Sequence, residues 1–78
     1  MKATVEVLPS GRFDIVGLRK PAINPLAIEN GKETFEIIIL RTFLGKTYKT
    51  LKSAIKALES KGFEYVPEDT INTVIGWD

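Results

Sequence analysis

A run of nine residues, 35–43, constrains the fold of this chain more than any other stretch; it reads Phe-Glu-Ile-Ile-Ile-Leu-Arg-Thr-Phe. Its centre is apolar and mostly β-branched, which predicts a short strand. Side chains alternate along a strand, so Ile37 and Ile39 share one face while Ile38 and Leu40 share the other. Because both faces are apolar, we expect the first to lie on the core and the second to need a cover of its own.

The stretch with a helical pattern is residues 50–61. Its apolar side chains recur at the spacing of one helical face: Leu51, Ala54, Ile55 and Leu58. Thr50 is a suitable N-cap, and Gly62 suits the left-handed position that ends many helices. A helix of about eleven residues is too short to be stable alone in water, so we expect it to pack on the sheet against Ile37 and Ile39.

Alternating apolar residues and turn signals predict strands on both sides of this helix, among them residues 2–8 and 70–77. Asn30-Gly31 is the strongest hairpin signal, since a type I′ turn needs a positive φ at both central positions. The expected fold is therefore a single α+β domain, residues 1–78. It consists of an antiparallel sheet of roughly five to seven strands with one amphipathic helix packed on one face.

Two covers for Ile38 and Leu40 remain open besides an unrelated partner. The loop at 19–26 holds two prolines and the apolar residues Ile23 and Leu26, which a purely solvated loop would not need. The second cover is another copy of the chain, because a two-fold dimer would bury the same patch on both copies. Burial of apolar surface stabilises by ~25 cal/mol per Å², so leaving both side chains wet is unfavourable.

The chain contains no histidine and no cysteine. These absences exclude most zinc sites and every mechanism that uses a histidine base or a thiolate nucleophile. The carboxylates are scattered and follow no calcium-loop pattern, so we expect no enzyme, no metal and no cofactor. No stretch approaches the ~18 apolar residues of a membrane span, and we expect a cysteine-free chain of this kind in the cytoplasm.

Charge is unevenly distributed, although the net charge is only +1. Residues 41–61 carry six basic side chains against one acid, a net charge of +5, whereas residues 62–78 carry four acids and no base. Lysines near a helix N-terminus oppose the helix dipole, which favours a functional role such as binding an anionic partner. The candidate partner-binding residues are Arg41, Lys46, Lys49, Lys52 and Lys56. The alternative is that the acidic segment folds back beside the basic one and neutralises it.

Two short motifs bear on nucleotide and nucleic-acid binding. Residues 45–47, Gly-Lys-Thr, match only the end of a phosphate-binding loop, because Leu40 stands where the first glycine is required. Residues 61–66, Lys-Gly-Phe-Glu-Tyr-Val, resemble the RNA-stacking motif of RNA recognition motif domains. Glu64 stands where that motif needs a small residue, and a helix C-terminus explains Lys-Gly-Phe without RNA. Nucleic-acid binding through the basic segment 41–61 is the alternative to a protein partner.

Residues 49–58, Lys-Thr-Leu-Lys-Ser-Ala-Ile-Lys-Ala-Leu, are followed by Lys61-Gly62-Phe63. Together they resemble the strand-cap-helix-strand core of small phage and plasmid proteins, among them anti-CRISPR proteins. The resemblance implies a small, non-enzymatic inhibitor that binds a host defence complex which handles nucleic acid. It transfers no functional residue to this chain. The expected partner is thus a protein or a protein–nucleic-acid complex, bound by a monomer or a homodimer.

Overall fold

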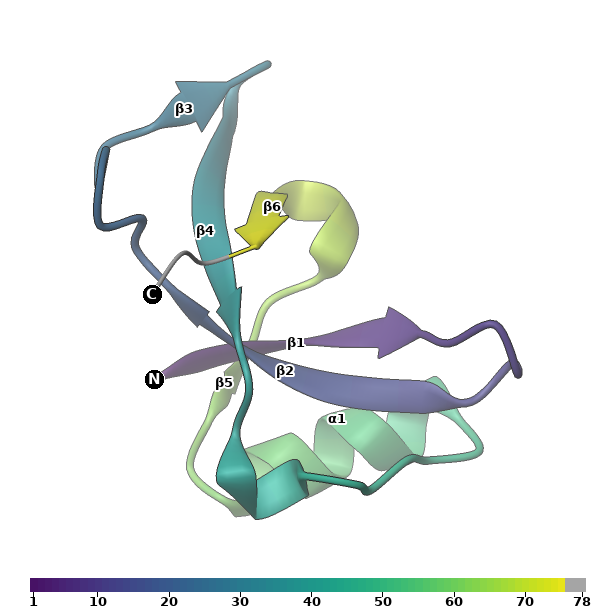
Figure 1. The fold of residues 1–78 in the computed structure, drawn as a ribbon. Helices are drawn as coiled ribbons and strands as arrows, with labels where there is room; N and C mark the ends of the chain where they lie inside the picture. The colour runs from purple at the N-terminus through teal and green to yellow at the C-terminus, as the bar shows by residue number, and fades with distance from the viewer. Residues whose placement is uncertain (76–78) are drawn as a thin grey trace.

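The computed structural model describes residues 1–75, which form strands, one α-helix and two short 3₁₀ turns (Figure 1). In chain order the elements are β1 (Lys2–Val7), β2 (Phe13–Arg19), β3 (Ile28–Glu29), β4 (Lys32–Ile38), η1 (Arg41–Phe43), α1 (Leu51–Ser60), β5 (Glu64–Tyr65), η2 (Glu68–Thr70) and β6 (Asn72–Ile75). The α+β class and the amphipathic helix at 51–60 are confirmed. Residues 76 and 77 of the predicted last strand lie outside the described residues.

The sheet is mixed, so the prediction of a purely antiparallel sheet is wrong. Its order is β3-β4-β2-β1-β5, with β6 paired to β4 as well. The pairs β1–β2, β2–β4 and β3–β4 are antiparallel, whereas β5 lies parallel to β1 and β6 lies parallel to β4. Parallel pairing requires a crossover connection. The long path through β2, β4 and α1 returns the chain to the start of β1, where Lys2 pairs with Glu64.

Local signals at turns and helix ends have the predicted geometry. Asn30 and Gly31 have φ angles of 55° and 75°, as a type I′ hairpin between β3 and β4 requires. The hydroxyl of Thr50 accepts a hydrogen bond of 3.1 Å from the backbone N–H of Ser53 and caps α1. At the other end Gly62 has a φ of 87°, and the backbone N–H of the following residue donates to the carbonyl of Leu58.

Helix α1 packs on the β1–β2 pair and not on Ile37 and Ile39, so that predicted contact is wrong. The buried residues of this cluster are Ala3, Val5, Ile15, Phe43, Ala54 and Leu58. Leu40 packs against the same cluster, while Ile39 is 76% exposed. Ile37 and Ile38 therefore point to opposite faces of the sheet, as predicted. The helix, however, lies on the face of Ile38 and Leu40.

Gly17 explains how Ile38 and Leu40 fit on the helix side. A Cβ atom at Gly17 would lie 2.8 Å from Cγ1 of Ile38 and 2.8 Å from Cδ2 of Leu40, so both side chains occupy the space that a larger residue would fill. Ile38 and Leu40 are half-buried by their own chain. The Pro-containing loop does not cover them, because Ile23 and Leu26 are 88% and 84% exposed. Since their own chain already buries part of Ile38 and Leu40, less apolar surface remains there for the expected dimer to cover.

The opposite face of the sheet carries a second, smaller cluster. Leu18, Phe35 and Ile71 are buried there, with Val66 packed beside them. Ile37 pairs with Leu18 across β2 and β4 and so shares this face. In Figure 1, α1 lies on one side of the β1–β2 pair, whereas η2, β6 and the β3–β4 hairpin lie on the other. The molecule thus has a helix end and a hairpin end.

Candidate docking surface

The outer side of α1 carries an apolar hollow of about 620 Å³ between charged side chains. It is lined by Leu51, Lys52, Ile55, Lys56 and Glu59, which we call the α1 face. The predicted apolar stripe of the helix is therefore divided. Ala54 and Leu58 face the sheet and are completely buried, whereas Leu51 remains 42% exposed and Ile55 is half-buried. Sequence periodicity assigned all four residues to the core, because it reports a common face but not how wide the contact is.

The five predicted basic residues are all exposed, and the structure brings two of them together. Lys52 and Lys56 lie one helical turn apart and frame the hollow. Lys49 directly precedes the N-cap of the same helix. Arg41 belongs to η1, whose Phe43 ring lies 5.9 Å from the ring of Phe63, just beyond the helix C-terminus. Arg41 and Lys49 are thus near opposite ends of α1.

None of these basic side chains has an ion-pair partner within residues 1–75. The acidic segment lies elsewhere: Glu64 is 4.0 Å from Lys2, and Glu68 is close to Glu6. Within residues 1–75 no ion pair joins the acidic segment to the five basic residues, so direct neutralisation is not seen there; Asp78 lies outside the described residues. The cations of the helix end are left available for a partner.

Negative charge gathers on the sheet instead. Glu6 and Asp14 are directly opposite one another on β1 and β2. Burial, followed by the charges of Glu68 and Asp14, raises the pKa of Glu6 above its ordinary value. Like charges that face each other disfavour ionisation, which is the physical cause of the electrostatic part of this shift. The sheet therefore carries a small acidic cluster of its own, separate from the basic residues of α1.

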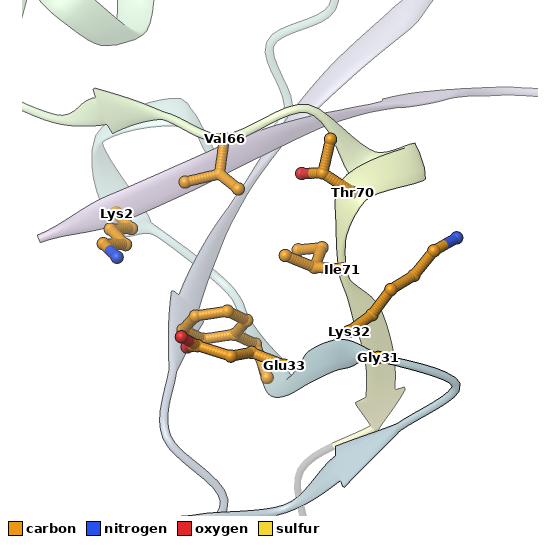
Figure 2. A pocket seen from close by; sticks show the side chains of 8 residues that line it. Lys2, Gly31, Lys32, Glu33, Val66, Thr70 and Ile71 are labelled. Carbon is orange, nitrogen blue, oxygen red and sulfur yellow. The ribbon is translucent and has the colours of Figure 1, made fainter.

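A second hollow, of about 280 Å³, lies between the start of β1, the β3–β4 hairpin and η2 (Figure 2). It is lined by Lys2, Gly31, Lys32, Glu33, Phe35, Val66, Thr70 and Ile71. Figure 2 shows Lys2 and Lys32 on opposite sides of the hollow, with the Lys32 side chain extending away from it. The ammonium of Lys2 lies 5.7 Å from the centroid of the Phe35 ring and 4.0 Å from Glu64.

The charges around this second hollow are largely matched. Lys20 donates a hydrogen bond to Glu33, and its ammonium also lies 4.6 Å from the centroid of the Phe35 ring. The hydrogen bond and the charge of Lys20 hold the pKa of Glu33 below its ordinary value. The second hollow thus lacks the concentration of unpaired cations that surrounds α1.

A third feature is an exposed apolar segment, residues 22–29, which we call the arm. Its side chains Ile23, Leu26 and Ile28 are 88%, 84% and 69% exposed. Sequence reasoning recognised the apolar character of this loop but treated it as a cover for β4. The signal that could have corrected this is Gly17, which leaves β4 no need of a cover.

Hydrogen bonds hold both ends of the arm. The backbone N–H of Ala22 donates to the Glu36 carboxylate at 3.1 Å, and Nε of Arg19 donates to the same carboxylate at 2.7 Å. At the hairpin turn, the amide of Asn72 donates to the carbonyls of Glu29 and Lys32 at 2.8 and 3.2 Å. These contacts fix the arm in place, so the exposure of its apolar side chains is a defined property of the fold.

The described residues contain no group of three or more carboxylates that could hold a metal ion. Within residues 1–75, α1 is the longest helix, and it is too short and too polar to cross a membrane. Comparisons of the chain with protein-family models, with curated proteins and with solved structures find no match.

Proposed function

We propose that this protein acts by binding alone, and that its α1 face docks on an acidic surface of a protein partner. The observation that carries the proposal is the combination of an apolar hollow with unpaired cations on one exposed helix face. Stable interfaces commonly bury a few apolar anchors at their centre and keep charged groups at the rim. Leu51 and Ile55 supply the anchors, while Lys52 and Lys56 supply the rim.

The charges contribute to specificity and to the rate of encounter. A positive patch attracts an acidic partner over several ångströms and disfavours basic ones. The long methylene stems of Lys52 and Lys56 also widen the apolar floor of the hollow, since lysine can bury its stem and keep its ammonium in water. Arg41, Lys46 and Lys49 extend the positive field beyond the hollow toward both ends of the helix.

The absence of catalytic residue types supports a role without chemistry. The sequence has neither histidine nor cysteine. The α1 face offers a single carboxylate, Glu59. Acid–base catalysis commonly needs a pair of titratable groups, or a base, whose pKa values the site has shifted.

A narrower form of this proposal names the partner class. The resemblance to small phage and plasmid proteins implies a host defence complex that handles nucleic acid, met in the cytoplasm. By covering an acidic surface of that complex, α1 would then prevent the complex from binding its other ligands there.

Direct binding of nucleic acid is the second candidate function, and the five unpaired basic residues favour it. Phosphate contacts by Lys and Arg would give an affinity that falls steeply with salt. Single-strand binding usually adds exposed aromatic rings on which bases stack. The aromatic residues that flank α1 in the sequence, Tyr48 and Phe63, are half-buried, and the hollow between the lysines is aliphatic. This composition suits a protein partner better.

Charge reversal on α1 tests the proposal. The protein partner is first captured from the host cell with the wild type. The affinity of the triple variant Lys49→Glu, Lys52→Glu, Lys56→Glu for that partner should be lower by at least about a hundredfold. Lys32→Glu, an exposed lysine on the hairpin end, is the matched control and should retain it. If the triple variant keeps its protein partner, the α1 face is not the docking surface. If it loses only salt-sensitive binding to DNA or RNA, the second candidate replaces the first.

A further inference from the structure

The arm has the properties of an interface. The molecule that covers it is a separate question from the partner proposed for the α1 face. Leu26 and Ile28 of the arm border a hollow of about 280 Å³. That hollow is lined by Lys20, Leu26, Ala27, Ile28 and Glu33. Exposed aliphatic side chains scattered singly need no explanation, but three on one short, fixed segment, two of which line the same hollow, indicate an interaction site.

The charges at the rim of this hollow indicate what can cover it. Lys20 and Glu33 carry opposite charges and are paired with each other, so the rim of the hollow is locally neutral. In a two-fold contact the same patch is used on both copies, so a residue that meets a second residue of the partner is met by it in turn. An arrangement in which Lys20 of either copy meets Glu33 of its partner is therefore allowed by the symmetry and would match both signs twice.

The α1 face cannot be matched with itself in this way. A two-fold contact through Lys52 and Lys56 would bring like charges together without a compensating acid other than Glu59. The rim of the arm's hollow, which carries one charge of each sign, therefore differs from the α1 face in being able to match itself in charge.

We propose that the arm is a homodimer interface, in which the arms of two copies pack against each other across a two-fold axis. Ile23 and Leu26 of each copy cover the apolar hollow of the other. The arms are held by Glu36 and Asn72 before association, so little conformational freedom is lost when they meet.

The interface is small, which determines the strength to be expected. Stable complexes usually bury about 800 Å² on each partner, a sizeable part of the 5464 Å² that this chain exposes. Three aliphatic side chains per copy form a smaller patch than that. We therefore expect a dissociation constant on the order of micromolar.

Sedimentation equilibrium across the micromolar range is the primary test. The wild type should change from the 8.7 kDa mass of one chain to twice that mass as concentration rises. Leu26→Lys should remain a single chain throughout, with association weakened at least about tenfold. Ile39→Lys is the matched control, since Ile39 is also an exposed aliphatic residue but lies outside the arm, and it should dimerise like the wild type.

Both substitutions are at exposed positions, and unchanged thermal unfolding in dilute solution verifies that each variant is folded. A second measurement uses the absence of cysteine in the chain. Leu26→Cys should be joined into covalent dimers by a short bis-maleimide, whereas Ile39→Cys should remain a monomer.

Three results would overturn the proposal. The first is a wild type that remains a monomer at high micromolar concentration. Binding of this monomer to anionic lipid vesicles through the arm would identify a membrane surface as the occupant instead of a second copy. The second is a dimer that Leu26→Lys leaves intact. The third is a dimer that Ile39→Lys abolishes. None of these results bears on the α1 face, so the proposed function is tested separately.

Discussion

The α1 face and the arm both expose aliphatic side chains, yet they are surrounded by different charges. Around Leu51 and Ile55 the neighbours are mainly unpaired lysines. Around Leu26 and Ile28 a lysine and a glutamate neutralise each other. Apolar exposure alone indicates that a surface has a partner, while the surrounding charge indicates what kind of partner fits. The first surface requires an acidic molecule, and the second accepts its own copy.

The largest expected effect tests whether the helix end and the arm differ in how much they contribute to the stability of the monomer. Leu58 on α1 is completely buried, so Leu58→Ala should lower the free energy of unfolding by about 2–5 kcal/mol. Leu26→Ala on the arm should change it by no more than about 0.5 kcal/mol. Urea denaturation at a concentration below that of dimer formation measures both.

Ile55→Ala provides an intermediate point on the same scale. Ile55 is only half-buried, so its truncation should be less destabilising than that of Leu58. Equal losses for Leu26 and Leu58 would show that the arm is part of the core, and the comparison between the two ends would fail.

A smaller effect is expected at Gly17, where β4 crosses from the hairpin end to the helix end. Gly17→Ala places a methyl group against Ile38 and Leu40 and should destabilise the fold by about 1–3 kcal/mol through overpacking. The double variant Gly17→Ala, Leu40→Ala should lose less than the sum of its single changes, because the second substitution makes room for the first. If the losses in the free energy of unfolding are additive, the contact between residue 17 and Leu40 is not the cause of the destabilisation by Gly17→Ala.

The smallest expected effect concerns the attachment of the arm and depends on pH. The hydrogen bond from the backbone N–H of Ala22, followed by that from Arg19, holds the pKa of Glu36 below its ordinary value. A lowered pKa in the folded state stabilises the fold above the ordinary pKa, and this contribution is lost as pH falls through the folded value. Glu36→Gln should therefore be less stable than the wild type at neutral pH, with the difference closing in acid.

Thermal unfolding at a series of pH values measures this difference. Glu29→Gln is the matched control, because Glu29 is an exposed carboxylate of the same hairpin whose side chain has no hydrogen bond among residues 1–75. Its stability should follow that of the wild type. A Glu36→Gln variant with the same pH profile would indicate that this carboxylate does not hold the arm.

Local features of this fold could be predicted from sequence because their causes are local. The cap at Thr50, the turn at Asn30-Gly31 and the helix end at Gly62 depend on a few neighbouring residues, and each is confirmed. The exposure of the basic residues also followed from their type. The parity of Ile37 and Ile38 is likewise a local property of an extended backbone.

The side of the sheet that the helix covers could not be predicted in the same way. Alternation says which residues share a face but not which face is inside. That choice depends on Gly17, which lies about twenty residues earlier and admits Ile38 and Leu40 only once β2 and β4 are paired. The parallel pairing of β5 and β6 and the exposure of Leu51 also depend on tertiary contacts. The basic residues of the α1 face could thus be predicted from sequence, whereas the exposure of Leu51 beside them and that of the arm depend on the three-dimensional arrangement.

The parallel pairing of β1 with β5 also determines the order in which this chain can fold. The β1–β2 hairpin contains only local contacts and can form within microseconds. One edge of β1 nevertheless remains open until Glu64 and Tyr65 arrive from the far side of α1, and β4 similarly waits for β6. Closing such long loops precedes any stabilising contact between their ends, which slows folding. During synthesis on the ribosome, both apolar clusters therefore stay incomplete until the last strands have emerged.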